Sequence, residues 1–107
     1  ASLVGSEMCI RDSINSLPEA EKIDGYTVLQ HMEKGEFDKI LFKRWEKKVY
    51  EVYFQKNNRV FYITVDKENI YLLHSCRKQK NKTEKKDANI VRKRAKELGN
   101  MLGRKFI

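Results

Sequence analysis

The spacing of apolar residues changes along the chain, and the first pattern predicts a helix. Four apolar residues recur every three positions: Ile23, Tyr26, Leu29 and Met32. This spacing is typical of one face of a helix. Leu17-Pro18 precedes the pattern and Gly35 follows it, and proline is favoured in a first helical turn while glycine often ends a helix. We expect a helix from about residue 19 to Lys34, although Gly25 in its interior disfavours it.

From Ile40 the apolar period becomes two, which predicts β-strands. The segments 40–45, 49–54, 59–65 and 70–76 are rich in β-branched and aromatic residues, and polar turns separate the later ones. Strands joined by short turns form an antiparallel meander. Alternation places Tyr50, Val52 and Phe54 on one face and Val49, Glu51 and Tyr53 on the other. We expect the first face to pack on helices and the second to offer polar groups.

The last pattern is again helical. Its apolar stripe is Ala88, Val91, Ala95, Leu98 and Leu102, and its basic face is Lys85, Lys86, Arg92, Lys93 and Lys96. We expect Thr83 to cap this helix through its hydroxyl group. The whole pattern predicts one α+β domain with an N-terminal helix or helical hairpin, a meander of three to four strands and a C-terminal amphipathic helix.

Residues 1–13 are expected to lie outside this domain. The run SLVGSEMCIRDS resembles the in-frame translation of a transposon adapter used in sequencing libraries. On this interpretation the domain spans residues 14–103, its natural start is unknown and an N-terminal element is missing. The alternative is a genuine helix from Glu7 to Leu17. Without Cys9, Cys76 has no disulfide partner, and no apolar run is long enough for a membrane span, so we expect a cytoplasmic protein.

Positive charge is concentrated in the C-terminal third. Residues 77–105 carry 12 Lys and Arg against 3 Asp and Glu, whereas residues 13–76 carry 10 of each. Such a footprint is typical of a surface that contacts phosphate groups. The segment 77–82 contains four cations and no apolar side chain, so we expect a solvated loop. For the basic residues of the final helix alone, a simple solvated face remains the plainer interpretation.

Three stretches together resemble the RelE/ParE-type toxins of bacterial and phage toxin–antitoxin pairs, most closely the HigB-like branch. They are YEVYF, NRVFYI and IYLLHSCRKQKNKTEKKDANIVRKRAKEL, and the resemblance covers residues 14 to about 99. The matches to the family pattern are Arg59 in a strand, Leu72-Leu73-His74 in the last strand, Arg77, Lys78 and Lys80 in the basic loop, and Lys82-Thr83 at the helix start. The departures are Tyr53 for arginine, Asn58 for an aromatic residue, Cys76 for phenylalanine and Glu84 for proline.

The resemblance implies cleavage of messenger RNA on the ribosome, by attack of a ribose 2′-hydroxyl on the adjacent phosphate. Negative charge develops on phosphorus in this reaction, and positioned cations stabilise it. The catalytic residues expected are Arg59, His74, Lys78 and Lys80, and the RNA-binding residues expected are Tyr53, Arg77, Lys82, Lys85 and Lys86. The implied partners are a helix-turn-helix antitoxin, the ribosome and mRNA. We expect no cofactor and no metal, because the acids and the two histidines lack ligand spacing.

Several alternatives stay open at this stage. His74 is either a general acid or base, since histidine changes protonation near neutral pH, or a strand histidine bonded to the backbone. The tyrosines either stack on bases or fill the core. Cys76 is interpreted as a small buried apolar residue. The chain as a whole is either the endoribonuclease, a ParE-like toxin that inhibits gyrase by protein binding, or a catalytically degenerate RNA-binding member.

Overall fold

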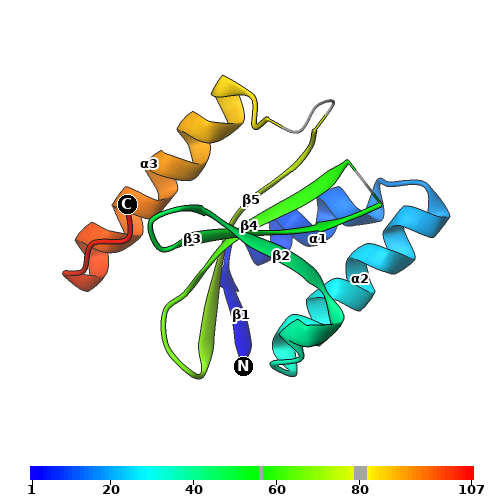
Figure 1. The fold of residues 1–107 in the computed structure, drawn as a ribbon, viewed down its shortest axis with the longest axis horizontal. Helices are drawn as coiled ribbons and strands as arrows, with labels where there is room; N and C mark the ends of the chain where they lie inside the picture. Colours follow the sequence, from blue (N-terminus) through cyan, green and yellow to red (C-terminus); the bar gives the residue numbers. More distant parts are fainter. Residues whose placement is uncertain (56, 79–81) are drawn as a thin grey trace.

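The computed structural model describes residues 1–55, 57–78 and 82–107, and these form an α+β fold (Figure 1). The elements in chain order are β1 (Ser2–Gly5), α1 (Glu7–Asn15), α2 (Glu19–Glu33), the 3-10 helix η1 (Phe37–Lys39), β2 (Leu41–Glu46), β3 (Val49–Phe54), β4 (Asn58–Thr64), β5 (Asn69–Arg77) and α3 (Lys85–Leu102). The predicted class is confirmed, since helix, meander and C-terminal helix follow in the expected order.

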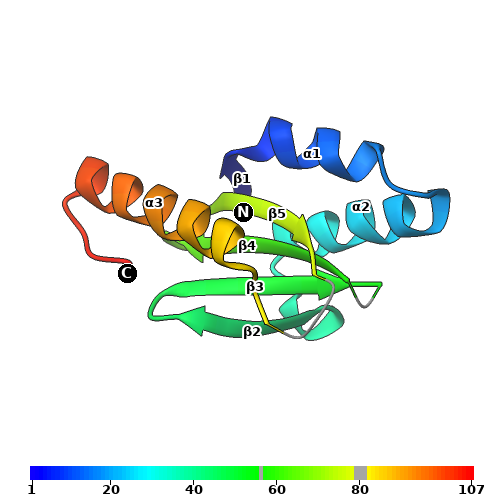
Figure 2. The same ribbon diagram turned by 90° about the horizontal axis from the view of Figure 1, so that it is seen from above.

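One mixed sheet organises the molecule. Its strands lie in the order β1-β5-β4-β3-β2, and β2 to β5 form the antiparallel meander that the period of two predicted. The strands run side by side in Figure 2, with β2 at one edge. At the other edge, β1 pairs in parallel with β5 and sets Leu3 opposite Ile70. This fifth strand was not predicted, because residues 1–13 were placed outside the domain.

The two N-terminal helices cover one face of the sheet. Leu29 and Met32 of α2 are buried as predicted, whereas Ile23 is exposed and Val28 lies in the core instead. Gly25 is explained by close packing, since a Cβ atom there would lie 2.9 Å from Ile14 and 3.1 Å from Phe54. The glycine that disfavoured the helix in sequence therefore allows α2 to approach α1 and the sheet closely.

The first fifteen residues contribute to this core. Leu3, Ile10 and Ile14 are buried and belong to the same apolar cluster as Leu29 and Leu72. Helix α1 corresponds to the alternative of a helix from Glu7 to Leu17. That residues 1–13 come from an adapter, and that the natural domain starts at residue 14, both stay predictions. They concern the source of these residues and not how the residues pack.

Helix α3 covers the opposite face, so that the sheet lies between α3 and the α1–α2 pair (Figure 1). Val91, Ala95 and Leu98 pack on the sheet, and Phe106 of the C-terminal tail closes the cluster. The residues of the predicted apolar stripe are buried except Leu102. Leu102 is exposed because the next residue, Gly103, adopts the left-handed conformation and ends the helix.

The predicted cap of α3 was wrong. Glu84 occupies the N-cap position without a side-chain hydrogen bond. The hydroxyl of Thr83 instead accepts a hydrogen bond from Trp45 Nε1 at 3.2 Å, which ties the start of the helix to β2. Within the described residues, no helix combines the length and the apolar character required to cross a membrane.

Candidate functional site

The strand register gathers polar side chains from four strands on the face that α3 covers. Directly paired residues of neighbouring strands project to the same side of a sheet, as do residues two apart on one strand. Two rows of paired residues result: Leu41, Tyr53, Arg59 and Cys76 form one, and Lys43, Glu51, Phe61 and His74 form the other. The face expected to offer polar groups therefore does so at one end, while its other end packs on α3.

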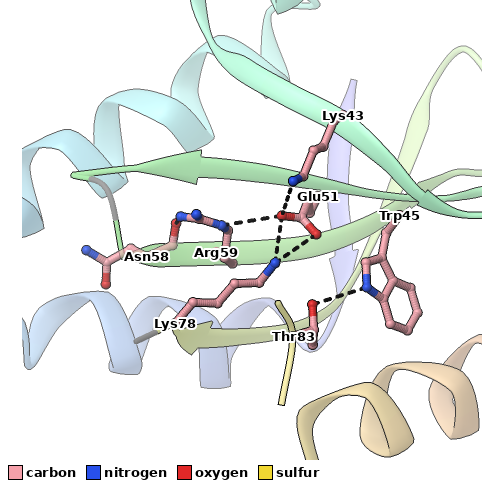
Figure 3. Close-up of polar contacts among 7 residues, drawn as sticks. All are labelled: Lys43, Trp45, Glu51, Asn58, Arg59, Lys78 and Thr83. Atoms are coloured by element: carbon pink, nitrogen blue, oxygen red, sulfur yellow. Dashed lines mark hydrogen bonds and ion pairs between the residues drawn. The ribbon is translucent and has the colours of Figure 1, made fainter. Parts of the chain in front are cut away.

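Glu51 is the centre of a buried charge cluster, drawn in Figure 3. Its side chain is 0% exposed, and its two carboxylate oxygens lie 3.1 and 3.3 Å from Lys78 Nζ. Arg59 Nε lies 3.3 Å from Glu51 Oε1, and Lys43 Nζ lies 4.0 Å from the same oxygen. The Lys78 and Arg59 side chains are only 3% and 10% exposed. A buried charge without a partner costs several kcal/mol, about 3–5 when one partner is removed, so Glu51 is what allows both cations to lie here.

Aromatic rings complete the surroundings of the cations. The Arg59 guanidinium carbon lies 4.9 Å from the centre of the Tyr53 ring, and Lys78 Nζ lies 5.9 Å from that of Phe61. Such contacts favour a positive charge over the ring face. Tyr53, which replaces an arginine of the family pattern, therefore supports Arg59 instead of adding a further charge.

The expectation of a fully solvated loop was wrong at Lys78. The backbone N–H of Lys78 donates to Asn57 O at 2.6 Å, just after β5 ends, and the side chain extends over Phe61 to Glu51. Arg77, one residue earlier, is 52% exposed and pairs with Glu21 at 2.9 Å. Lys80, the fourth expected catalytic residue, lies outside the described residues.

His74 contacts a carboxylate, so the expected alternative of a backbone partner was wrong. His74 Nε2 lies 2.8 Å from Asp87 Oδ1, in the first turn of α3, and both side chains are largely buried. An aspartate in this position fixes the orientation of an imidazole ring. The pair lies beside the charge cluster, because His74 is directly opposite Phe61 and Phe61 is directly opposite Glu51.

Cys76 stands two residues after His74 on the same face. Cys76 is half-buried rather than buried as predicted. Desolvation raises the pKa of its thiol to about 12, which argues against a nucleophile. The donor atoms of His74, Cys76 and Asp87 all lie within 4.8 Å of one another. The sequence argument about ligand spacing did not anticipate this group, because Asp87 is 13 residues from His74.

The remaining expected RNA-binding residues lie around this region. Lys82, Lys85 and Lys86 are exposed at and just before the N-terminal end of α3, and Tyr53 is half-buried beneath Arg59. The structure thus brings Arg59, Lys78 and Tyr53 together, with the exposed lysines at the rim.

Sequence reasoning missed two residues of the site, Glu51 and Asp87. Each carried a signal. Glu51 is an acid on the same face of its strand as Val49, two residues earlier. Asp87 precedes Val91 and Ala95 at the four-residue spacing of the buried stripe. Charged residues at buried positions of a periodic pattern are rare unless they are paired. The pattern therefore signals that each acid has a partner, but it does not identify that partner.

The comparison with known families covers most of the chain. Residues 12–96 match the family model described as Phage derived protein Gp49-like (DUF891). No curated protein matches the chain significantly. The matched segment runs from the end of α1 into α3 and includes Glu51, Arg59, His74, Lys78 and Asp87. The chain therefore belongs to the Gp49-like family of phage-derived proteins, a family of RelE/ParE-like toxins.

Proposed function

We propose that this protein is the toxin of a type II toxin–antitoxin pair and belongs to the HigB-like branch. We propose further that it is a metal-independent endoribonuclease. It cleaves mRNA on the ribosome and so inhibits translation in the cytoplasm. The observation that carries the proposal is the charge cluster. One carboxylate, that of Glu51, faces three cations from three different segments: Lys43, Arg59 and Lys78. With three cations to one carboxylate, the cluster keeps an excess of positive charge.

This excess suits the reaction. Attack of the 2′-oxygen forms a bond to phosphorus, the bond to the 5′-oxygen breaks, and the products are a 2′,3′-cyclic phosphate and a 5′-hydroxyl end. The transition state carries more negative charge on the phosphate oxygens than the ground state does. A phosphate that competes with Glu51 for Arg59 and Lys78 gains most when that charge is largest, which lowers the barrier. Arginine adds a planar fork that binds two oxygens at once.

Proton transfer is assigned to His74. The reaction removes a proton from the 2′-hydroxyl and delivers one to the departing 5′-oxygen. Asp87 holds Nε2 of the imidazole ring, so Nδ1 is the atom that exchanges a proton with the RNA. A carboxylate behind the ring stabilises the imidazolium that forms when His74 accepts a proton.

The exposed rim supports binding of the RNA backbone. Lys82, Lys85 and Lys86 surround the N-terminal end of α3, and Arg77 lies at the end of β5. Lysine and arginine contacts to phosphate supply affinity without sequence preference. The proposed partners are the ribosome with its mRNA and a helix-turn-helix antitoxin that neutralises the toxin.

A second candidate function is RNA binding without cleavage. Two observations favour it: Tyr53 replaces a cation of the family pattern, and the side chains of Arg59 and Lys78 are both largely buried against Glu51. A ParE-like toxin that acts by protein binding is the third candidate, and the cluster of cations gives it no specific support.

Incubation of the purified protein with translating ribosomes, followed by mapping of the RNA ends, tests the proposal. We expect new 5′-hydroxyl ends within the mRNA and 2′,3′-cyclic phosphates on the upstream fragments. Ribosome binding without new ends would favour the non-cleaving candidate. Inhibition of gyrase, with neither ends nor ribosome binding, would favour the ParE-like one. For a substitution of His74 in this assay, His31→Gln is a suitable control. His31 also pairs with a carboxylate, Glu36 at 3.0 Å, but it lies on α2.

A further inference from the structure

Three side chains with different donor atoms converge at the junction of β5 and α3. His74 and Cys76 project from one face of β5, and Asp87 reaches them from the first turn of α3. Their donor atoms all lie within 4.8 Å of one another, and His74 Nε2 and Asp87 Oδ1 are already 2.8 Å apart. Two rigid elements therefore present an imidazole nitrogen, a thiol sulfur and a carboxylate oxygen to one point.

The identity of the donors selects among metal ions. Mg²⁺ and Ca²⁺ prefer six or more oxygen ligands, and this group offers one carboxylate. Zn²⁺ binds imidazole, thiolate and carboxylate, at about 2.0–2.3 Å, in tetrahedral sites. Two such ligands on one zinc ion are roughly 3.3–3.7 Å apart, so the His74 and Asp87 side chains need to separate by only about half an ångström to admit the ion. The donor atoms of all three side chains lie within 4.8 Å of one another, so the Cys76 sulfur has to approach the other two donors by at most about 1.5 Å.

The charge balance also fits a divalent cation. On binding, the Cys76 thiol releases its proton to solvent, and the thiolate and the Asp87 carboxylate then neutralise the two positive charges of the ion. The positive charges of Lys78 and Arg59 lower the pKa of the Cys76 thiol, whereas the negative charge of Glu51 raises it. The Glu51 carboxylate offsets only part of the positive charge of these two cations.

We propose that His74, Cys76 and Asp87 form a binding site for Zn²⁺, with water in the fourth position. The site shares His74 and Asp87 with the proposed proton transfer. Its test requires neither RNA nor a partner, so a failure of the metal site is distinguishable from a failure of the proposed function. Sites with three protein ligands and one water are the open type of zinc site. The proposal also gives a role to Cys76, where the family pattern has a phenylalanine that binds no metal.

Titration of the metal-free protein with Co²⁺ tests the site, because cobalt takes the place of zinc and a thiolate ligand gives an intense charge-transfer absorption. We expect saturation of this absorption at one equivalent and its loss when Zn²⁺ is added. Cys76→Ser should abolish the absorption and weaken Zn²⁺ binding at least about tenfold. Asp87→Asn should keep the absorption, since the thiolate remains, with weaker affinity.

Two control variants match the site residues. Cys9 is the other cysteine of the chain and is exposed, and His31 pairs with Glu36 without a nearby cysteine donor among the described residues. Cys9→Ser and His31→Gln should both bind Co²⁺ and Zn²⁺ as the parent does. Absence of the absorption in the parent protein, or its persistence in Cys76→Ser, would overturn the proposal.

Thermal unfolding supplies a readout that does not depend on absorption. Zn²⁺ at about a hundred times its Kd should raise the Tm of the parent and both controls by roughly 10 °C. Cys76→Ser should show no such shift. If Cys76→Ser does not fold, the weaker affinity of a folded Asp87→Asn protein decides the question, and unchanged Zn²⁺ affinity in that variant would contradict the site.

Discussion

The two faces of the sheet are built differently. Against α1 and α2, the sheet presents a continuous apolar surface that includes Val52, Val60 and Leu72, each buried to 1% exposure or less. Against α3, the surface is apolar at Phe61 and Ile63 but charged at Glu51, next to the helix start. The face against α1 and α2 therefore serves packing only. The face against α3 packs at one end and holds charged side chains at the other.

Stability does not explain the charged half of the α3 face, as is expected of a buried ion cluster. Burying an ion cluster is no more favourable than burying apolar residues of the same volume, and is often less so. Natural proteins depart from local packing rules mainly at functional sites. The charged half of the α3 face is such a departure, because the protein holds Arg59 and Lys78 in place with a fully buried carboxylate.

The largest expected effect comes from Glu51. Glu51→Ala should lower the free energy of unfolding by about 3–5 kcal/mol, because Arg59 and Lys78 lose their buried counter-charge. Leu72→Ala, on the apolar face, should cost a similar 2–5 kcal/mol through the cavity that it leaves. Denaturant unfolding measures both values.

The triple variant Glu51→Leu, Arg59→Met and Lys78→Met sharpens this comparison. It removes the buried carboxylate together with both buried cations, so most of the lost stability should return while RNA cleavage does not. A triple variant as unstable as Glu51→Ala would show that the charges contribute to stability in their own right.

Cys76, at the edge of the charged half, should react slowly with thiol reagents. Its pKa is raised to about 12 by burial, against 9 for an ordinary thiol, so the reactive thiolate is about a thousandfold scarcer near pH 8. Mass spectrometry after alkylation should find Cys9, which is exposed, modified first. The raised pKa also means that the thiol ionises first in the unfolded chain as the pH rises above about 9, so stability should fall between about pH 9 and pH 12. Equal labelling of Cys9 and Cys76 at pH 8 would contradict the prediction that Cys76 reacts slowly.

The lysines at the rim of the charged half should affect affinity rather than rate. Lys85→Ala and Lys86→Ala should each reduce the slope of log affinity against log salt by about one for binding to RNA, as expected for one lost phosphate contact. Lys22→Ala, on α2, is the matched control and should leave the slope unchanged. Identical slopes for all three variants would remove the rim from the RNA-binding surface.

The smallest effect is expected from an exposed ion pair on the same side of the molecule. Arg92 of α3 lies 2.5 Å from Glu46 of β2, and its hydrogen bonds lower the pKa of the Glu46 carboxyl. The stabilisation is present above the ordinary pKa of glutamate and lost as the pH falls through the lowered value. Because solvent screens exposed pairs, Arg92→Ala should leave the Tm at pH 7 nearly unchanged. A loss of stability comparable to that of Glu51→Ala would contradict the distinction between exposed and buried charges.

Sequence patterns predicted most of the fold because their signals are local. The period of two located β3 at its observed bounds, Val49–Phe54, as the structure confirms. Strand β1 was missed for a different reason, since its residues were set aside as an adapter. Its packing against β5 is visible only once the sheet is assembled.

The charge cluster was beyond sequence reasoning because it depends on register. Glu51, Arg59 and Lys78 lie on or after three different strands, and only the pairing of those strands brings them together. Loop composition placed Lys78 in solvent, whereas a buried acid and an aromatic ring draw it inward. Asp87 reaches His74 because α3 crosses back over the sheet, which no local pattern encodes.

The rate of mRNA cleavage by Arg59 variants tests the central claim most directly. If Arg59 stabilises charge on the phosphate, Arg59→Ala should cleave ribosome-bound mRNA about a hundredfold more slowly or worse, and Arg59→Lys should recover only part of the rate because lysine lacks the planar fork. Thermal unfolding measured beside the rate separates a lost site from a lost fold. An Arg59→Ala protein that folds and cleaves at the parental rate would contradict the claim that this cation cluster acts on RNA phosphate.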